Sequence, residues 1–193
     1  MKKSLNGLTT LLLVAYPFFV FFSLENLPLH WLLLGLTTLF LLRLILVLRQ
    51  SAVKQRGYLI FLGAASALIG IGVSVYAFLA NSATGLLFYP LLVNLLCLGL
   101  FLFSLVFPPT VIELFARLVE KDLSPQGVVY TRKVTWAWCG FFLFNGSISL
   151  LTALQDNVIY WTWYNGFISY ILIGLFFIIE LMVRRIVRQR DLK

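Results

Sequence analysis

Six apolar stretches, each about long enough to cross a lipid bilayer as a helix, determine what this 193-residue chain can fold into. A helix needs roughly 20 apolar residues to span hydrocarbon about 30 Å thick. Hydrophobic residues make up 61% of the chain and charged residues only 11%, which excludes a water-soluble globular fold. The sequence therefore predicts an all-α polytopic membrane helix bundle, a single transmembrane domain over residues 1–193. The expected helices are residues 8–24, 31–47, 58–79, 86–107, 134–154 and 160–183.

The first stretch has one feature of a secretory signal, because Lys2 and Lys3 precede it. It is long for the apolar region of a signal, however, and no cleavage site of small residues follows. We interpret it as the first spanning helix, bent at Pro17.

All fifteen Lys and Arg residues fall on one side of this six-helix trace, whereas Glu25, His30 and Asp156 lie on the other. By the positive-inside rule both termini are expected in the cytoplasm. Arg43, near the end of the second helix, is expected to snorkel to the headgroups. The formal charge of +8 thus indicates membrane orientation, and no nucleic-acid partner is expected. The basic residues are Lys2, Lys3, Arg43, Arg49, Lys54, Arg56, Arg117, Lys121, Arg132, Lys133, Arg184, Arg185, Arg188, Arg190 and Lys193.

The longest polar interruption contains a short amphipathic helix, predicted over residues 110–123. Thr110 and Glu113 form a capping-box pattern at its start. Ser124 and Pro125 then suit the start of another helix. The amphipathic helix is interpreted either as a connector along the inner membrane interface or as a docking face for a partner. Its apolar face would carry Val111, Leu114, Phe115, Leu118 and Val119, and its candidate interaction face Glu113, Arg117, Glu120 and Lys121.

Residues suited to catalysis or metal binding are sparse. His30 is the single histidine and is read as an interfacial residue beside Trp31. No catalytic residue, cofactor or metal site is therefore predicted. Glu180 is the one carboxylate inside an apolar run, which makes it a functional candidate. The simpler expectation is a local ion pair with Arg184, four residues later.

Two asparagines, Asn94 and Asn145, lie at similar depth in their helices, which would allow them to meet near the membrane midplane but does not decide whether they do. Such a pair would act as interhelical glue or, together with Glu180, would line a substrate path. The third helix carries two pairs of small residues four positions apart, which favour close packing against a neighbouring helix. These pairs are Gly63 with Ala67 and Ser66 with Gly70.

A set of aromatic and small residues in the fifth helix, followed by a tryptophan in the sixth, resembles the bacterial intracellular septation protein A family. A sister group of small membrane proteins associated with aryl polyene lipid pathways is similarly close. The set comprises Ala137, Trp138, Phe141, Phe142, Gly146 and Trp161. The likeness extends to Pro17, Phe21, Phe22, Pro109, Ile112 and Pro125.

The resemblance implies a multi-pass protein of the bacterial cell inner membrane that serves envelope biogenesis, septation or cell division, with no catalytic residues to carry over. The first hypothesis is a non-enzymatic protein that binds other inner-membrane envelope proteins. Membrane lipid is its other expected partner. The sequence is also compatible with a homo-oligomer. The alternative is a small carrier or accessory for a lipid-linked or hydrophobic substrate. An enzyme is the third hypothesis and would need a constellation that the sequence does not display.

Overall fold

The computed structural model describes residues 9, 11–12, 15–49, 57–120, 122–155 and 157–191, and every regular element among them is a helix. Five helical segments are long and apolar enough to cross a membrane: Leu29–Leu48, Ile60–Leu79, Thr84–Val106, Pro125–Leu154 and Val158–Arg185. The predicted class, an all-helical membrane protein, is confirmed. The elements are α2 (Tyr16–Asn26), α3 (Leu29–Leu48), α4 (Gly57–Leu79), α5 (Thr84–Leu87), α6 (Tyr89–Val106), α7 (Val111–Val119), α8 (Pro125–Leu154), α9 (Val158–Trp163), η2 (Tyr164–Ile168) and α10 (Ser169–Asp191).

The helix predicted over residues 8–24 is described only in part, since residues 8, 10, 13 and 14 lie outside the described residues. Its described portion, α2, has 11 residues, with Pro17 in its first turn. At a rise of about 1.5 Å per residue, α2 alone is too short to cross the hydrocarbon. It is therefore not among the five candidate crossings.

The last two crossings differ most from the predicted boundaries. The predicted helix 134–154 begins nine residues earlier, at Pro125, where the Ser124 hydroxyl accepts a hydrogen bond of 3.1 Å from the Gly127 amide. Arg132 and Lys133 are exposed and do not interrupt α8. The predicted helix 160–183 is divided by a π-helical turn, η2, between α9 and α10. Such turns are rare and often mark functional positions in helices.

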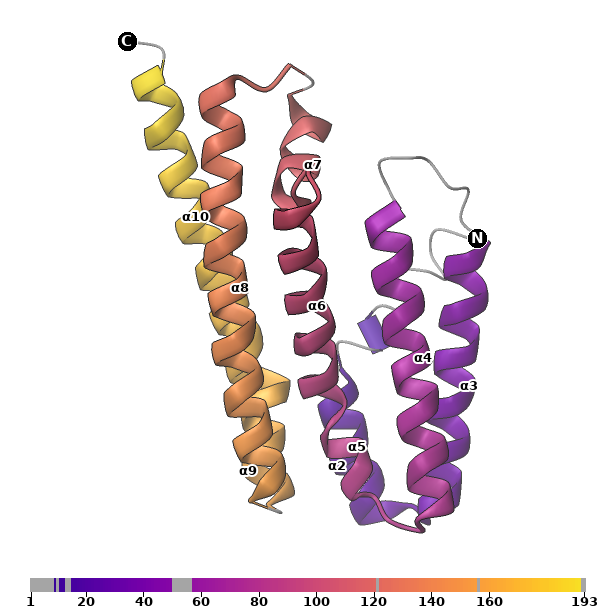
Figure 1. Ribbon diagram of the computed structural model, residues 1–193. Coiled ribbons are helices and arrows are strands. Elements are labelled where there is room, and N and C mark those ends of the chain that lie inside the picture. Colours follow the sequence, from indigo (N-terminus) through magenta and orange to yellow (C-terminus); the bar gives the residue numbers. More distant parts are fainter. Residues whose placement is uncertain are drawn as a thin grey trace.

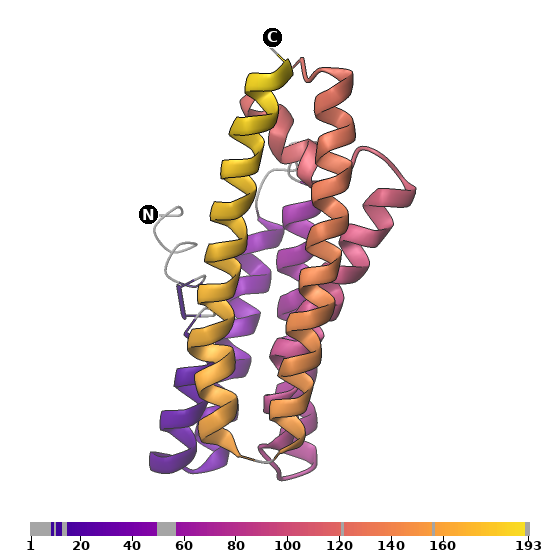
Figure 2. The same ribbon diagram turned by 90° about the vertical axis from the view of Figure 1, so that its left-hand side faces the viewer.

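The helices form two groups with a looser seam between them. In Figure 1, α3 and α4 stand side by side on one flank, and α6 lies against α8 on the other. The segment from α9 through η2 to α10 runs alongside α8, as both views show (Figures 1 and 2). α4 and α6 face each other across the seam and pack less extensively than the two pairs that flank it. Two cavities described below lie along this seam.

Small residues bring α3 and α4 into close contact, as their spacing predicted. A Cβ atom added at Gly70 would lie 2.3 Å from Cε1 of Phe40, whose ring is buried. A Cβ added at Gly63 would lie 3.1 Å from Cγ2 of Val47. Because nothing lies within 4 Å of a Cβ added at Gly72, only some glycines of α4 are needed for packing.

Two buried clusters hold the bundle together. One centres on Trp161, whose indole N–H donates a 2.8 Å hydrogen bond to the Leu87 carbonyl, and on Tyr16, whose hydroxyl donates to the Leu86 carbonyl at 3.0 Å. These bonds attach α9 and α2 to α5. The second cluster is aromatic and joins α6, α8 and α10. Its ring contacts involve Phe101, Trp138, Phe141, Phe142 and Phe176.

Candidate functional site

A cavity of about 430 Å³ lies among residues of α2, α3, α4, α6, α8, η2 and α10. Volumes of this size fall in the range of small-molecule sites, which are mostly apolar with a few polar groups that orient the ligand. Here the surrounding helices are membrane-spanning, so a polar lining is costly and points to function. The polar lining includes Arg43, Ser66, Asn94, Asn145, Asn165 and Ser169.

Asn94 and Asn145 meet at this cavity, which settles the question that their similar depth left open. The Asn145 side-chain N–H group donates to Asn94 Oδ1 at 3.0 Å and to Ser169 Oγ at 3.3 Å. The Tyr164 hydroxyl donates to Asn145 Oδ1 at 2.8 Å. The close approach of the helices is possible because a Cβ at Gly146 would lie only 3.2 Å from the Asn94 Cβ. Asn145 thus links three segments through one amide.

The π turn supplies a second amide that the sequence did not single out. Asn165 Oδ1 accepts a 2.6 Å bond from Ser149, and Asn165 Nδ2 donates to the Trp161 carbonyl at 3.0 Å and to Thr152 at 3.2 Å. A π turn inserts one extra residue and so changes the direction of the side chains after it. Asn165 thus joins the π turn to α8, and it lines the same cavity as Asn145.

Arg43, near the end of its helix, is the charged member of the cavity lining among the described residues. It lies 14 residues after the first residue of α3, about 21 Å along the helix. The guanidinium Nη2 lies 3.8 Å from the position of a Cβ at Gly63, between α3 and α4. No Asp or Glu is among the described residues that line the cavity, and none of the described side chains forms an ion pair with Arg43. Arg43 lies five residues before the last residue of α3, about 8 Å from that end of the helix.

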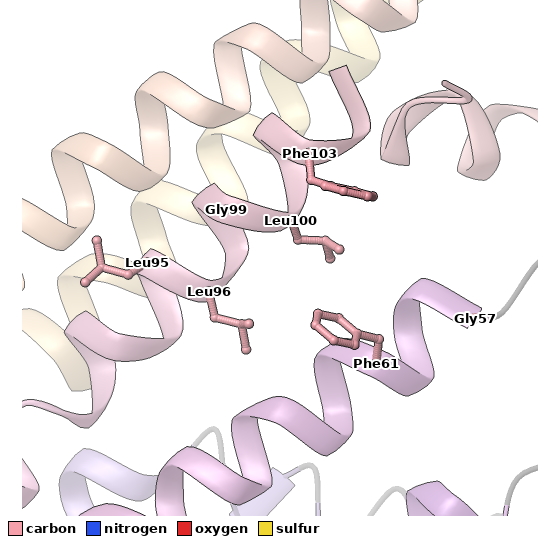
Figure 3. A pocket seen from close by; sticks show the side chains of 7 residues that line it. All are labelled: Gly57, Phe61, Leu95, Leu96, Gly99, Leu100 and Phe103. Atoms are coloured by element: carbon pink, nitrogen blue, oxygen red, sulfur yellow. The ribbon is translucent and has the colours of Figure 1, made fainter. Parts of the chain in front are cut away.

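A second, larger cavity of about 660 Å³ lies along the same seam between α4 and α6. Phe61 of α4 and both Leu96 and Leu100 of α6 project into the space between the two helices (Figure 3). On α4 its lining ends at Phe61, and the polar cavity begins at Leu62. The two cavities are therefore neighbours on one helix pair. The described residues of its lining are all apolar: Gly57, Phe61, Leu95, Leu96, Gly99, Leu100 and Phe103.

The candidate interaction face on α7 is oriented partly toward the bundle. Thr110 caps the helix, accepting a 3.2 Å bond from the Glu113 amide, as predicted. Glu113 is only 6% exposed, and its carboxylate pairs with the Arg117 guanidinium at 2.8 Å. Glu120 is half-buried, and Lys121 lies outside the described residues. The exposed side of α7 is instead apolar and consists of Phe115, Leu118 and Val119.

The remaining candidates lie away from the cavity. Glu180 does not line it, and its backbone carbonyl accepts a 3.3 Å bond from the Tyr130 hydroxyl. The expected ion pair between Glu180 and Arg184 is not formed within 4.0 Å. His30 is exposed beside Trp31, their ring centroids 5.5 Å apart.

Of the family-like residues, Ala137 is exposed, whereas Trp138, Phe141 and Gly146 are buried in helix contacts. Phe142 belongs to the aromatic cluster and also lines the polar cavity. Comparison of the chain with protein-family models, with curated proteins and with solved structures gave no significant match. The chemistry of the site is therefore argued from its own residues.

The polar cavity is suited to binding. Its amides and hydroxyls offer hydrogen-bond donors and acceptors, and Arg43 offers a positive charge. Within the described part of the chain, no three His, Cys, Asp or Glu side chains gather in one place. The arrangement favours recognition of a molecule that has both polar and apolar parts, because polar and apolar cavities adjoin.

Proposed function

We propose that this protein binds or carries an amphiphilic molecule, such as a lipid-linked substrate, in its polar intramembrane cavity. The observation that carries the proposal is the 430 Å³ cavity in which Asn94, Asn145 and Arg43 come together among spanning helices. Hydrogen-bonded asparagines alone would serve as glue between helices. Asparagines that only hold helices together need neither an adjoining cavity nor a cationic side chain. A bound ligand therefore explains more features of the site than helix packing does.

The setting proposed for this activity follows from the family resemblance and the charge pattern. The protein would be a non-enzymatic component of envelope biogenesis or septation in the bacterial inner membrane. The residues before α2 would complete a sixth crossing, with both termini in the cytoplasm. Asn94 and Asn145 would act as substrate-path residues.

Filling the cavity tests this function. Ser66 lines the cavity, and its hydroxyl donates only to the Gly63 carbonyl of its own helix, at 3.1 Å. We expect Ser66→Leu to lower the amount of amphiphile that copurifies in mild detergent, measured by native mass spectrometry, because the leucine side chain occupies the space. Ser147 is the matched control, since it is exposed and donates to Leu143 of its own helix at 2.8 Å. Equal retention by wild type, Ser66→Leu and Ser147→Leu would contradict the proposal.

A second candidate function is docking of a membrane partner protein through α7. The supporting observation is the exposed apolar face of this capped helix, where Val119 is 80% exposed. Lipid would cover such a face equally well. Capture of one discrete protein by a photoreactive residue at Leu118 would favour docking, and capture of lipid alone would exclude it.

A further inference from the structure

The positive charge at the polar cavity has no counterion among the described side chains. Arg43 contributes a guanidinium group, which is always protonated in proteins. The chain contains seven Asp and Glu residues. Four of them are described with their side chains, and none of the four lines the cavity: Glu113, Glu120, Asp122 and Glu180.

Two of the other three carboxylates belong to helices that reach the cavity, but they lie far along those helices. Glu25 lies eight residues after Pro17, the last residue of α2 that lines the cavity, or about 12 Å along the helix. Asp191 lies 18 residues after Ile173 of α10, or about 27 Å. Asp156 lies outside the described residues. The opposite charge is therefore expected on the bound molecule.

The guanidinium lies at the cavity, although Arg43 is only about 8 Å from the end of α3. Its Nη2 lies 3.8 Å from the position of a Cβ at Gly63, where the absence of a side chain leaves room for it. Arg49, six residues further along the chain, is exposed and does not line the cavity. Arg43 is thus placed to contact a molecule in the cavity.

Tyr89 adds a neutral hydrogen-bond donor to the same cavity. It lines the cavity and is only 7% exposed. Its ring packs against the rings of Tyr16 and Phe40, with centroid distances of 4.6 and 5.1 Å, but its hydroxyl bonds to none of the described residues. The phenol and the Arg43 guanidinium are close enough to interact electrostatically. An acceptor in the cavity can therefore use both donors.

From these observations we infer that the molecule held in the polar cavity is an anion, whose phosphate or carboxylate group accepts hydrogen bonds from Arg43 and Tyr89. The planar donors of a guanidinium match both of these groups. The inference rests on the proposed function and adds the charge of the ligand and the residues that recognise it.

The test measures binding of radiolabelled octyl phosphate to the purified full-length protein in dodecyl maltoside micelles. A short chain is used because the cavity holds about 430 Å³. We expect unlabelled octyl phosphate and octanoate to displace the probe. Octanol has the same chain but no charge, so it should displace the probe about tenfold less well.

Variants of the two donors assign the site. Arg43→Gln should weaken binding of octyl phosphate about tenfold, as loss of a charged hydrogen bond predicts, and Arg43→Lys should weaken it less. Tyr89→Phe keeps the ring and removes only the hydroxyl, so it should weaken binding about threefold and leave the melting temperature unchanged. Arg49→Gln is the matched control, because it removes the same charge from an exposed position on the same side of α3, and it should leave the affinity unchanged. Thermal unfolding verifies that each variant is folded.

The outcomes separate the inference from the proposed function. Displacement by octanol as effective as by octyl phosphate, or equal affinities of wild type and folded Arg43→Gln, would overturn the inference. Equal losses in Arg43→Gln and Arg49→Gln would also overturn it, since they would show only a general attraction to positive charge. Unchanged affinity in Tyr89→Phe would overturn the role of Tyr89.

Two further outcomes concern the source of the anion. Competition by inorganic phosphate as effective as by octyl phosphate would support the anion site and overturn the amphiphile of the proposed function. Absence of saturable octyl phosphate binding would overturn the inference alone. The proposed function would then fall only if Ser66→Leu also retained the amphiphile that copurifies with the wild type.

Discussion

Replacing Trp161 by alanine is expected to lower the free energy of unfolding by about 3–5 kcal/mol, the usual cost of removing a fully buried large aromatic side chain. Trp161 is 0% exposed, and its indole N–H bonds to the Leu87 carbonyl. Alanine would leave a cavity and an unpaired carbonyl where α9 meets α5 and α2. The measurement is reversible unfolding in detergent, followed by circular dichroism.

Trp163 provides a matched control for this substitution. It lies two residues further along the chain, is 59% exposed and contacts Phe167 of the next turn. Trp163→Ala should change stability by less than about 0.5 kcal/mol. Similar losses from the two substitutions would contradict the described packing of α9.

Asn145→Leu is expected to lower stability by about 1–3 kcal/mol and to abolish selective binding of the amphiphile. The substitution removes an amide that joins Asn94, Ser169 and Tyr164, leaving the buried Tyr164 hydroxyl without its acceptor. It also removes a polar group from the cavity wall. Unfolding and copurification of lipid are measured on the same preparation.

Asn145 could act in ligand binding or only in holding helices together, and a variant destabilised at a different place in the bundle distinguishes these two roles. Leu105 is 5% exposed and lines neither cavity, and Leu105→Ala should cost at least as much, about 2–5 kcal/mol. If Asn145 contributes to binding, Asn145→Leu loses the amphiphile and Leu105→Ala keeps it. Equal losses of bound amphiphile would mean that Asn145 acts only as glue between helices.

Local sequence signals predicted the features that depend on few residues. The membrane class follows from long apolar runs, and the helix starts at Thr110 and Ser124 follow from side chains that can cap the backbone only a few residues away. Similar depth allowed Asn94 and Asn145 to meet but did not decide it, because residues at one level come into contact only if their helices are neighbours and face each other.

Features that depend on rotation about a helix axis were not predicted. Asn165 lies in η2 and bonds to Ser149 of α8, and no pattern in the sequence marks that turn. The position of Arg43 along α3 did not indicate that its guanidinium would lie beside Gly63 of α4. The amphipathic pattern of α7 predicted that all polar residues would face away from the bundle, whereas Glu113 is buried and Phe115, Leu118 and Val119 are exposed.

The central claim, that the polar cavity holds an amphiphile, is tested most directly by photocrosslinking in native membranes. A photoreactive phenylalanine analogue is placed at Phe142, which lines the cavity, or at Phe144, which is 57% exposed on the same helix. Mass spectrometry identifies the adducts. We predict one narrow class of amphiphile at Phe142 and the bulk lipid mixture at Phe144. The same lipid mixture at both positions, or no adduct at Phe142, would contradict the claim.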